Sequence, residues 1–327
     1  MKQMTTLLAF VLLVGVTAVA QVPPGIGAAS FSRIGIDARP MAMGGAFVAM
    51  LQGPSIPYYN PASLVGKDPL SIGGMYSEPY GEDLGISFQS FGATAELGER
   101  EEPSRVVGVG LSVIQLRIDD IPIWDEDDPG ASGFFTATSA VYLVSAAIPV
   151  FEEWALGASA KVYSEHILEG RGQGLGFDLG LLGGFEVEGI PISFGLNAMD
   201  VGRTRIRWRG TEGEPVNYVT WTNKIGATAK LWEERVLLAC DFDWAVGRPA
   251  REQVAHVGLE FKPFDVVLLR GGVQTDLEGS LSVSAGFGLR VLDRYAIDYA
   301  YLPGKELGST HVLSIQLALF QYDESES

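Results

Sequence analysis

Residues Leu281–Val291 read LSVSAGFGLRV, and every odd-numbered position in this stretch is apolar. The even-numbered positions carry serine, glycine or arginine. Neighbours on one face of a helix lie three and four residues apart, so a helix cannot gather these apolar side chains on one side, whereas a β-strand can. The same alternation continues in Tyr295–Tyr301 and Leu313–Leu319. The sequence therefore predicts consecutive strands that each have one apolar face.

This alternation extends over most of the chain and divides it into fourteen predicted strands. The connections after even-numbered strands are mostly short, and those after odd-numbered strands are generally longer, notably 117–132 and 199–216. Residues 93–103 are an exception, because they are long where a short turn is expected. An even number of strands with short turns at one end is typical of bacterial outer-membrane barrels. The predicted strands are 69–76, 83–92, 104–116, 133–149, 153–163, 172–185, 191–198, 217–231, 234–244, 253–262, 265–274, 279–291, 293–301 and 310–320.

The polar face of these strands distinguishes a membrane barrel from a soluble sandwich. It carries glycine, serine and isolated charges instead of a solvated mixture of lysine and glutamate. Lipid offers no hydrogen bonds to the backbone, so a sheet in a membrane must close and leave no edge. We therefore predict an all-β fold, a transmembrane antiparallel β-barrel of about 14 strands with an N-terminal luminal plug.

The N-terminus predicts export. Lys2 precedes an uncharged apolar run, Leu7–Ala20, whose last three residues, Ala18–Ala20, form the small-x-small pattern of a signal-peptidase site. We expect a signal peptide at 1–20, a plug at 21–66, the barrel at 67–320 and a polar tail at 321–327, in the bacterial outer membrane. The single cysteine, Cys240, lies on the apolar face and rules out an internal disulfide.

Charge and composition exclude several classes of partner. The net charge of −17 argues against nucleic acid and against a polybasic membrane-surface role. The expected surroundings of the barrel are outer-membrane lipid and lipopolysaccharide. The acidic stretch 119–130 partly resembles a calcium loop, but Pro129 occupies a ligand position and Thr136 stands where the closing glutamate belongs, so a solvated loop is preferred. No serine lies in a Gly-x-Ser-x-Gly elbow. We expect no enzyme activity, no metal and no cofactor.

Residues 23–66 do not alternate. Four prolines, Pro40, Pro54, Pro57 and Pro61, permit only short helices separated by turns. A ring of fourteen strands encloses a lumen wider than side chains alone can fill, so this segment is expected to plug it.

Two parts of the segment resemble known barrel proteins. Residues 38–50 read ARPMAMGGAFVAM, and residues 58–64 read YYNPASL. They resemble the N-terminal segments of the FadL-type transporters of hydrophobic compounds and of the PorV/PorQ-type proteins, and the run at 38–49 looks closer to the PorV/PorQ version. In those proteins an Asp-rich stretch usually follows, whereas here Leu51–Ser55 reads LQGPS. The resemblance implies either passive uptake of hydrophobic, fatty-acid-like molecules or a secretion or surface-attachment role with protein cargo and secretion-system components.

The plug offers candidate ligand-binding residues and a turn. Flexible apolar side chains adapt to varied hydrophobic partners, although the same side chains can simply pack the plug against the wall. Asn60-Pro61-Ala62 is expected to form the tight turn that leads to the first strand. The apolar candidates are Met41, Met43, Phe47, Met50 and Leu51.

Charged residues on the inward face are the remaining candidates. They can line a path for a substrate or ion, or pair across strands and with plug residues, and pairing is preferred in a plugged barrel. The predicted lumen charges are Arg39, Lys161, Asp178, Lys224, Lys230, Asp241, Asp243, Glu260, Arg270, Arg290 and Asp298.

Three functions stay open at this stage: uptake of a hydrophobic small molecule, engagement of protein cargo, and a structural barrel without ligand. If the plug blocks the lumen, a hydrophobic ligand must leave through the wall. Strands 83–92 and 104–116, which contain Gly85, Gly108 and Gly110, are the predicted weak point of that wall.

Overall fold

The structure is a computed structural model that describes residues 28–50, 56–65, 70–81, 84–98, 106–125, 128–151, 153–292, 294–304 and 308–320. The predicted signal peptide, the polar tail and Leu51 lie outside the described residues.

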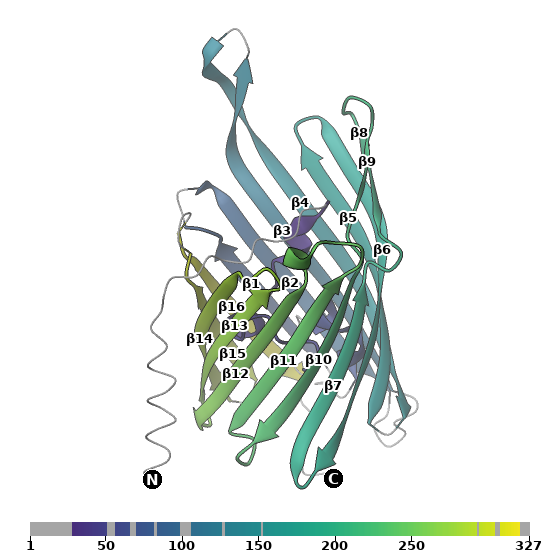
Figure 1. Cartoon of the computed structure of the whole chain (residues 1–327), viewed down its shortest axis with the longest axis vertical. Coiled ribbons are helices and arrows are strands. Elements are labelled where there is room, and N and C mark those ends of the chain that lie inside the picture. The colour runs from purple at the N-terminus through teal and green to yellow at the C-terminus, as the bar shows by residue number, and fades with distance from the viewer. Residues whose placement is uncertain are drawn as a thin grey trace.

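The described strands form a closed antiparallel barrel (Figure 1). Fourteen of them follow one another around a ring, and β1 pairs with β16 to close it. The fold class predicted from the alternation is confirmed. The ring consists of β1 (Leu70–Glu78), β2 (Ile86–Leu97), β3 (Val107–Asp125), β4 (Asp128–Phe151), β5 (Trp154–Ile167), β6 (Gly170–Val187), β7 (Ile190–Met199), β10 (Thr222–Leu231), β11 (Val236–Ala245), β12 (Val254–Phe264), β13 (Val267–Asp276), β14 (Leu281–Val291), β15 (Tyr295–Leu302) and β16 (Thr310–Phe320).

Two further strands, β8 (Arg205–Arg209) and β9 (Val216–Tyr218), form a hairpin that extends the sheet from β6. The prediction of one strand over 217–231 is therefore wrong. Residues 216–218 leave the ring because they pair with β8, and the barrel strand begins only at Thr222.

The prediction of a loop over 117–132 is also wrong. β3 and β4 continue as a long hairpin that projects beyond the rest of the barrel, with Ile121 opposite Phe135 and Pro122 opposite Phe134 (Figure 1). The pairing register shifts between Ile118 and Ile121, and Asp120 adopts a φ of 56°. The acidic residues that suggested a loop thus begin at a bulge within the hairpin.

The two faces of the strands differ as the alternation predicts. Phe287, Ile315 and Val257 are exposed on the outer face, as is Cys240. Ser284, Asp298 and Ser314 are buried on the inner face. A closed barrel with an apolar outer belt is suited to lipid on the outside and to polar contacts within. Among the described residues, no helix is long and apolar enough to cross a membrane.

The N-terminal segment lies inside the barrel as a plug made of short helical turns. These are η1 (Ser30–Arg33), α2 (Ala38–Ala42), α3 (Ile56–Tyr59) and η2 (Pro61–Leu64); a further turn, η5 (Ala250–Glu252), lies in the connection between β11 and β12. The turn α2 contacts β13 to β16, whereas η2 contacts β2 to β6. The plug therefore reaches opposite walls of the lumen.

Candidate functional site

The apolar residues of the plug pack into a core that they share with inward-facing residues of the wall. Phe47 packs edge-on against Tyr59 with ring centroids 5.2 Å apart, and Tyr59 packs edge-on against Tyr58 at 4.8 Å. Met43, Phe47 and Met50 are buried. Of the predicted ligand-binding residues within the described chain, only Met41 also lines the main cavity.

The two tyrosine hydroxyls fix the course of the plug. The hydroxyl of Tyr59 donates to the carbonyl of Ile36 (2.7 Å) and accepts from its amide (3.1 Å), and that of Tyr58 donates to the carbonyl of Ser32 (2.8 Å). Burial raises the pKa of both hydroxyls, so both remain protonated donors. They tie α3 to the chain before α2.

Asn60 serves as the junction between plug and wall. Its side-chain oxygen caps η2 by accepting from the amide of Ala62 (3.1 Å). Its Nδ2 donates to the carbonyls of Val48 (2.9 Å) and of Leu181 in β6 (3.0 Å). Asn197 of β7 completes the contact by donating to the carbonyl of Tyr59 (2.7 Å). Sequence reasoning missed Asn197, although its inward position on a predicted strand could have marked it.

Side chains of the wall also bind the backbone of residues 42–48. Asp241 accepts from the amides of Phe47 (2.5 Å) and Val48 (2.8 Å). The hydroxyl of Ser284 lies 3.1 Å from both the amide of Gly44 and the carbonyl of Ala42. The plug is thus held by hydrogen bonds from several strands.

Glycines in the wall mark where the plug backbone touches it. A Cβ added at Gly272 would lie 2.0 Å from the amide nitrogen of Gly44, and one at Gly195 would lie 2.3 Å from the carbonyl oxygen of Val48. No real side chain tolerates such distances, so glycine is required at both positions.

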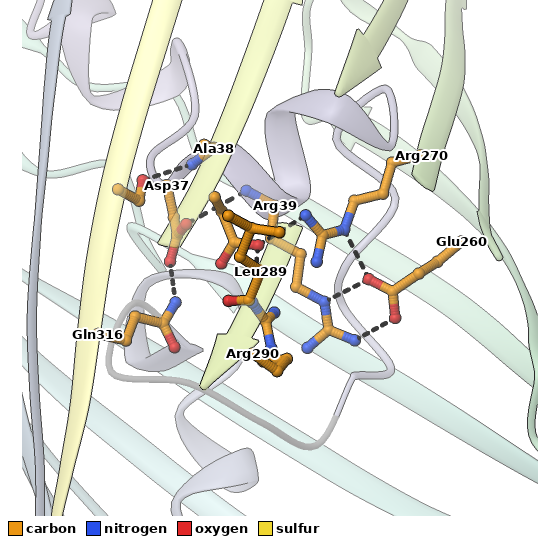
Figure 2. Close-up of polar contacts among 10 residues, drawn as sticks. Asp37, Ala38, Arg39, Glu260, Arg270, Leu289, Arg290 and Gln316 are labelled. Carbon is orange, nitrogen blue, oxygen red and sulfur yellow. Dashed lines mark hydrogen bonds and ion pairs between the residues drawn. The ribbon is translucent and has the colours of Figure 1, made fainter. Parts of the chain in front are cut away.

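An ion-pair network joins the plug to four strands of the wall (Figure 2). Arg39 binds Glu260 through two bonds of 2.9 and 2.8 Å, and Arg270 binds the same carboxylate at 2.6 Å. Arg270 and Arg290 both bind Asp298, at 2.7 and 3.0 Å. Beside this network, Gln316 donates to Asp37 (2.7 Å) and Ser314 accepts from the amide of Ala38 (2.7 Å).

A second buried cluster lies on the other side of the lumen. Lys161 binds Asp178 at 2.7 Å and Asp200 at 2.6 Å, and the hydroxyl of Tyr163 donates to Asp200 at 3.0 Å. Asp200 lies in the connection after β7, where no periodicity points inward, and sequence reasoning missed it. Lys224 pairs with Asp243, which lies opposite it on β11, whereas Lys230 pairs at the exposed turn end with Glu234.

A cavity of about 150 Å³ lies between the plug and the wall. It lies on the side of the plug that faces the longer connections, since Tyr80, Arg251 and Glu252 line it. Its apolar lining includes Ile34, Met41, Tyr58, Tyr59, Phe88 and Leu302. Its polar lining includes Thr222, Lys224, Asp243 and His256. The inward position of Phe88 on a predicted strand was an available signal that sequence reasoning did not use.

The predicted weak point of the wall, β2 and β3, is fully paired in this structure, and its weakness stays a prediction. The two strands pair without a shift from Ile86 opposite Ile118 to Leu97 opposite Val107. Gly108 and Gly110 instead face the plug, where an added Cβ would lie 2.2 Å from the carbonyl oxygen of Leu64 and 3.0 Å from Pro57 respectively. These glycines make room for the plug and leave the sheet intact.

The chain matches no protein-family model and no curated protein sequence. Its fold matches several solved structures. TbuX, a toluene transporter of Ralstonia pickettii, matches with a TM-score of 0.58 and 13% identity, over 88% of this chain and 99% of TbuX. TodX, a toluene transporter of Pseudomonas putida, matches with a TM-score of 0.57 and 13% identity, over 86% and 96%. A FadL homologue of Pseudomonas aeruginosa matches with a TM-score of 0.53 and 13% identity, over 86% and 97%. The chain therefore has the fold of the FadL-type outer-membrane transporters, a closed fourteen-stranded barrel with an N-terminal plug in its lumen.

Proposed function

We propose that the protein conducts small hydrophobic molecules across the bacterial outer membrane. The observation that carries this proposal is the cavity of about 150 Å³ above the plug. A cavity of this volume is large enough for a single aromatic ring. Met41, Tyr58, Tyr59 and Phe88 supply apolar surface for such a ring. The toluene transporters that share the fold support the same class of ligand.

The plug gives the cavity a floor. Its described segments contact walls on both sides of the lumen, so a molecule in the cavity does not face a straight aqueous pore. A molecule that crosses must therefore pass beside a displaced plug or through the wall. Either route selects for molecules that leave water readily, because the plug and the outer face of the barrel are both apolar.

A pair of neighbouring residues on β1 tests the role of the cavity. Ser77 is buried and lines the cavity, whereas Tyr76 is exposed on the lipid face. Ser77→Phe fills part of the cavity and is expected to lower the rate of toluene uptake by cells at least several-fold. Tyr76→Phe is the matched control and is expected to leave uptake unchanged. Heat-modifiable migration on gels checks that both variants assemble.

Equal uptake by the two variants and the unmodified protein would contradict transport through this cavity. Equal uptake would be expected if the protein were a structural barrel without ligand, or a barrel that only engages protein cargo. A medium-chain fatty acid assayed beside toluene distinguishes a ligand with a long chain from one with a single ring.

A further inference from the structure

The cavity has a polar side that a plain hydrocarbon would leave without partners. Thr222 and Lys224 lie on β10, Asp243 on β11 and His256 on β12, so these lining residues come from three adjacent strands. We propose that the ligand of this cavity is a neutral molecule with an apolar ring or chain and a hydroxyl group, as in a phenol. This inference rests on the proposed transport function and narrows the class of molecule.

Three atoms on the polar side lack hydrogen-bond partners among the described residues: Oδ1 of Asp243, Nε2 of His256 and Oγ1 of Thr222. The residues that carry these atoms are buried: Asp243 and His256 are each 8% exposed, and Thr222 is 4% exposed. The Nε2 atom of His256 does lie 3.4 Å from Oδ2 of Asp243, but without the alignment of a hydrogen bond. Polar atoms that are buried in this way favour a ligand that supplies the missing bonds.

These three atoms favour a ligand that donates a hydrogen bond. An ionised Asp243 carboxylate can only accept. The Nδ1 atom of His256 lies 2.7 Å from the carbonyl oxygen of Gly44 and must donate to it, which leaves Nε2 as the remaining hydrogen-bonding atom of the ring. The hydroxyl of Thr222 can accept or donate. A ligand hydroxyl can donate to one of these atoms and accept from Thr222.

The charges around the cavity favour a neutral ligand. Lys224 and Asp243 pair with each other, and Arg33 pairs with Glu252 at 3.3 Å. A carboxylate on the ligand would lie beside the Asp243 carboxylate, and an ammonium would lie beside Lys224. Each would meet a like charge at short range, and the opposite charge is already paired within the Lys224–Asp243 ion pair.

Equilibrium dialysis of the full chain in detergent micelles, against empty micelles, tests the proposal with phenol, toluene and benzoate. We expect phenol to bind about 10-fold more tightly than toluene after correction for partition into micelles, and benzoate to bind less tightly than phenol. Thr222→Val removes one hydroxyl at constant size and is expected to weaken phenol binding roughly 3- to 10-fold. The affinity for toluene should not change.

Two further variants make the test specific. Thr228→Val removes a hydroxyl from the same buried face of β10 at a residue that does not line the cavity, and should leave phenol binding unchanged. Thr222→Ser keeps the hydroxyl and should restore the affinity.

Equal binding of phenol and toluene, or a phenol preference that Thr222→Val does not alter, would overturn the hydroxyl inference and leave the proposed transport intact. Absence of specific binding for all three molecules would overturn both proposals.

Discussion

Gly272 and Gly271 are adjacent on β13 but differ in what surrounds them. A Cβ at Gly272 would lie 2.0 Å from the amide nitrogen of Gly44, whereas at Gly271 the nearest atom is the carbonyl oxygen of Ser284 at 4.0 Å. The methyl group of an alanine would therefore clash with the plug at position 272 but not at position 271.

Gly272→Ala is expected to destabilise the protein by about 1–3 kcal/mol, since it overpacks the contact between plug and wall. Gly271→Ala should be nearly neutral. Urea titration of the folded barrel, followed by its shift in gel migration, measures both. Equal midpoints for the two variants would mean that the plug does not pack against this part of β13.

Single residues also show what the sequence could and could not predict. The alternation assigned Glu260, Arg270 and Asp298 to the inward face, and all three are buried there. It could not assign their partners, because pairing depends on how the ring closes and on where the plug lies. Asp200 was missed because it lies in a connection, where spacing along the chain does not define a face.

At the scale of a strand, the alternation of inner and outer residues allows β14 to test the lipid-facing surface. Phe287 is 43% exposed on the outer face and packs against Tyr299 with ring centroids 5.3 Å apart. Val291 lies on the same face at the end of the strand.

Phe287→Arg places a charge within the apolar belt and is expected to cost about 2–4 kcal/mol, whereas the cost of Val291→Arg should fall to about 0–1 kcal/mol near the membrane surface. Refolding into lipid vesicles at graded urea concentrations gives both values. If Phe287→Arg assembles as well as the unmodified chain, the assignment of the inner and outer faces of β14 is incorrect.

The elements themselves were largely predictable, and their ends were not. Alternation identified every strand of the ring, because burial against a polar lumen and exposure to lipid impose a period of two. It failed over 117–132, where acidic residues suggested a loop but the hairpin pairs beyond a bulge at Asp119 and Asp120. It also failed at 217–231, because residues 216–218 pair with β8 instead of joining the ring.

At the scale of the whole molecule, the plug fills the lumen and so prevents the barrel from being an open pore. A ring of fourteen strands encloses a lumen that conducts water and small solutes when it is empty. Deletion of residues 25–58 is therefore expected to convert a nearly silent protein into a conducting pore in planar bilayers. Conductance unchanged by this deletion would show that the segment does not occlude the lumen.

The ion pair between Arg39 and Glu260 also has a consequence for biogenesis. The two residues are 221 positions apart, and the bond between Ala38 and Ser314 spans 276. Synthesis produces the plug first, yet its binding surface is complete only when β13 to β16 exist. The plug therefore stays undocked until nearly the whole chain has been delivered to the membrane. Closing such long loops is slow, so insertion of the last strands and seating of the plug are expected to occur as one late, cooperative event.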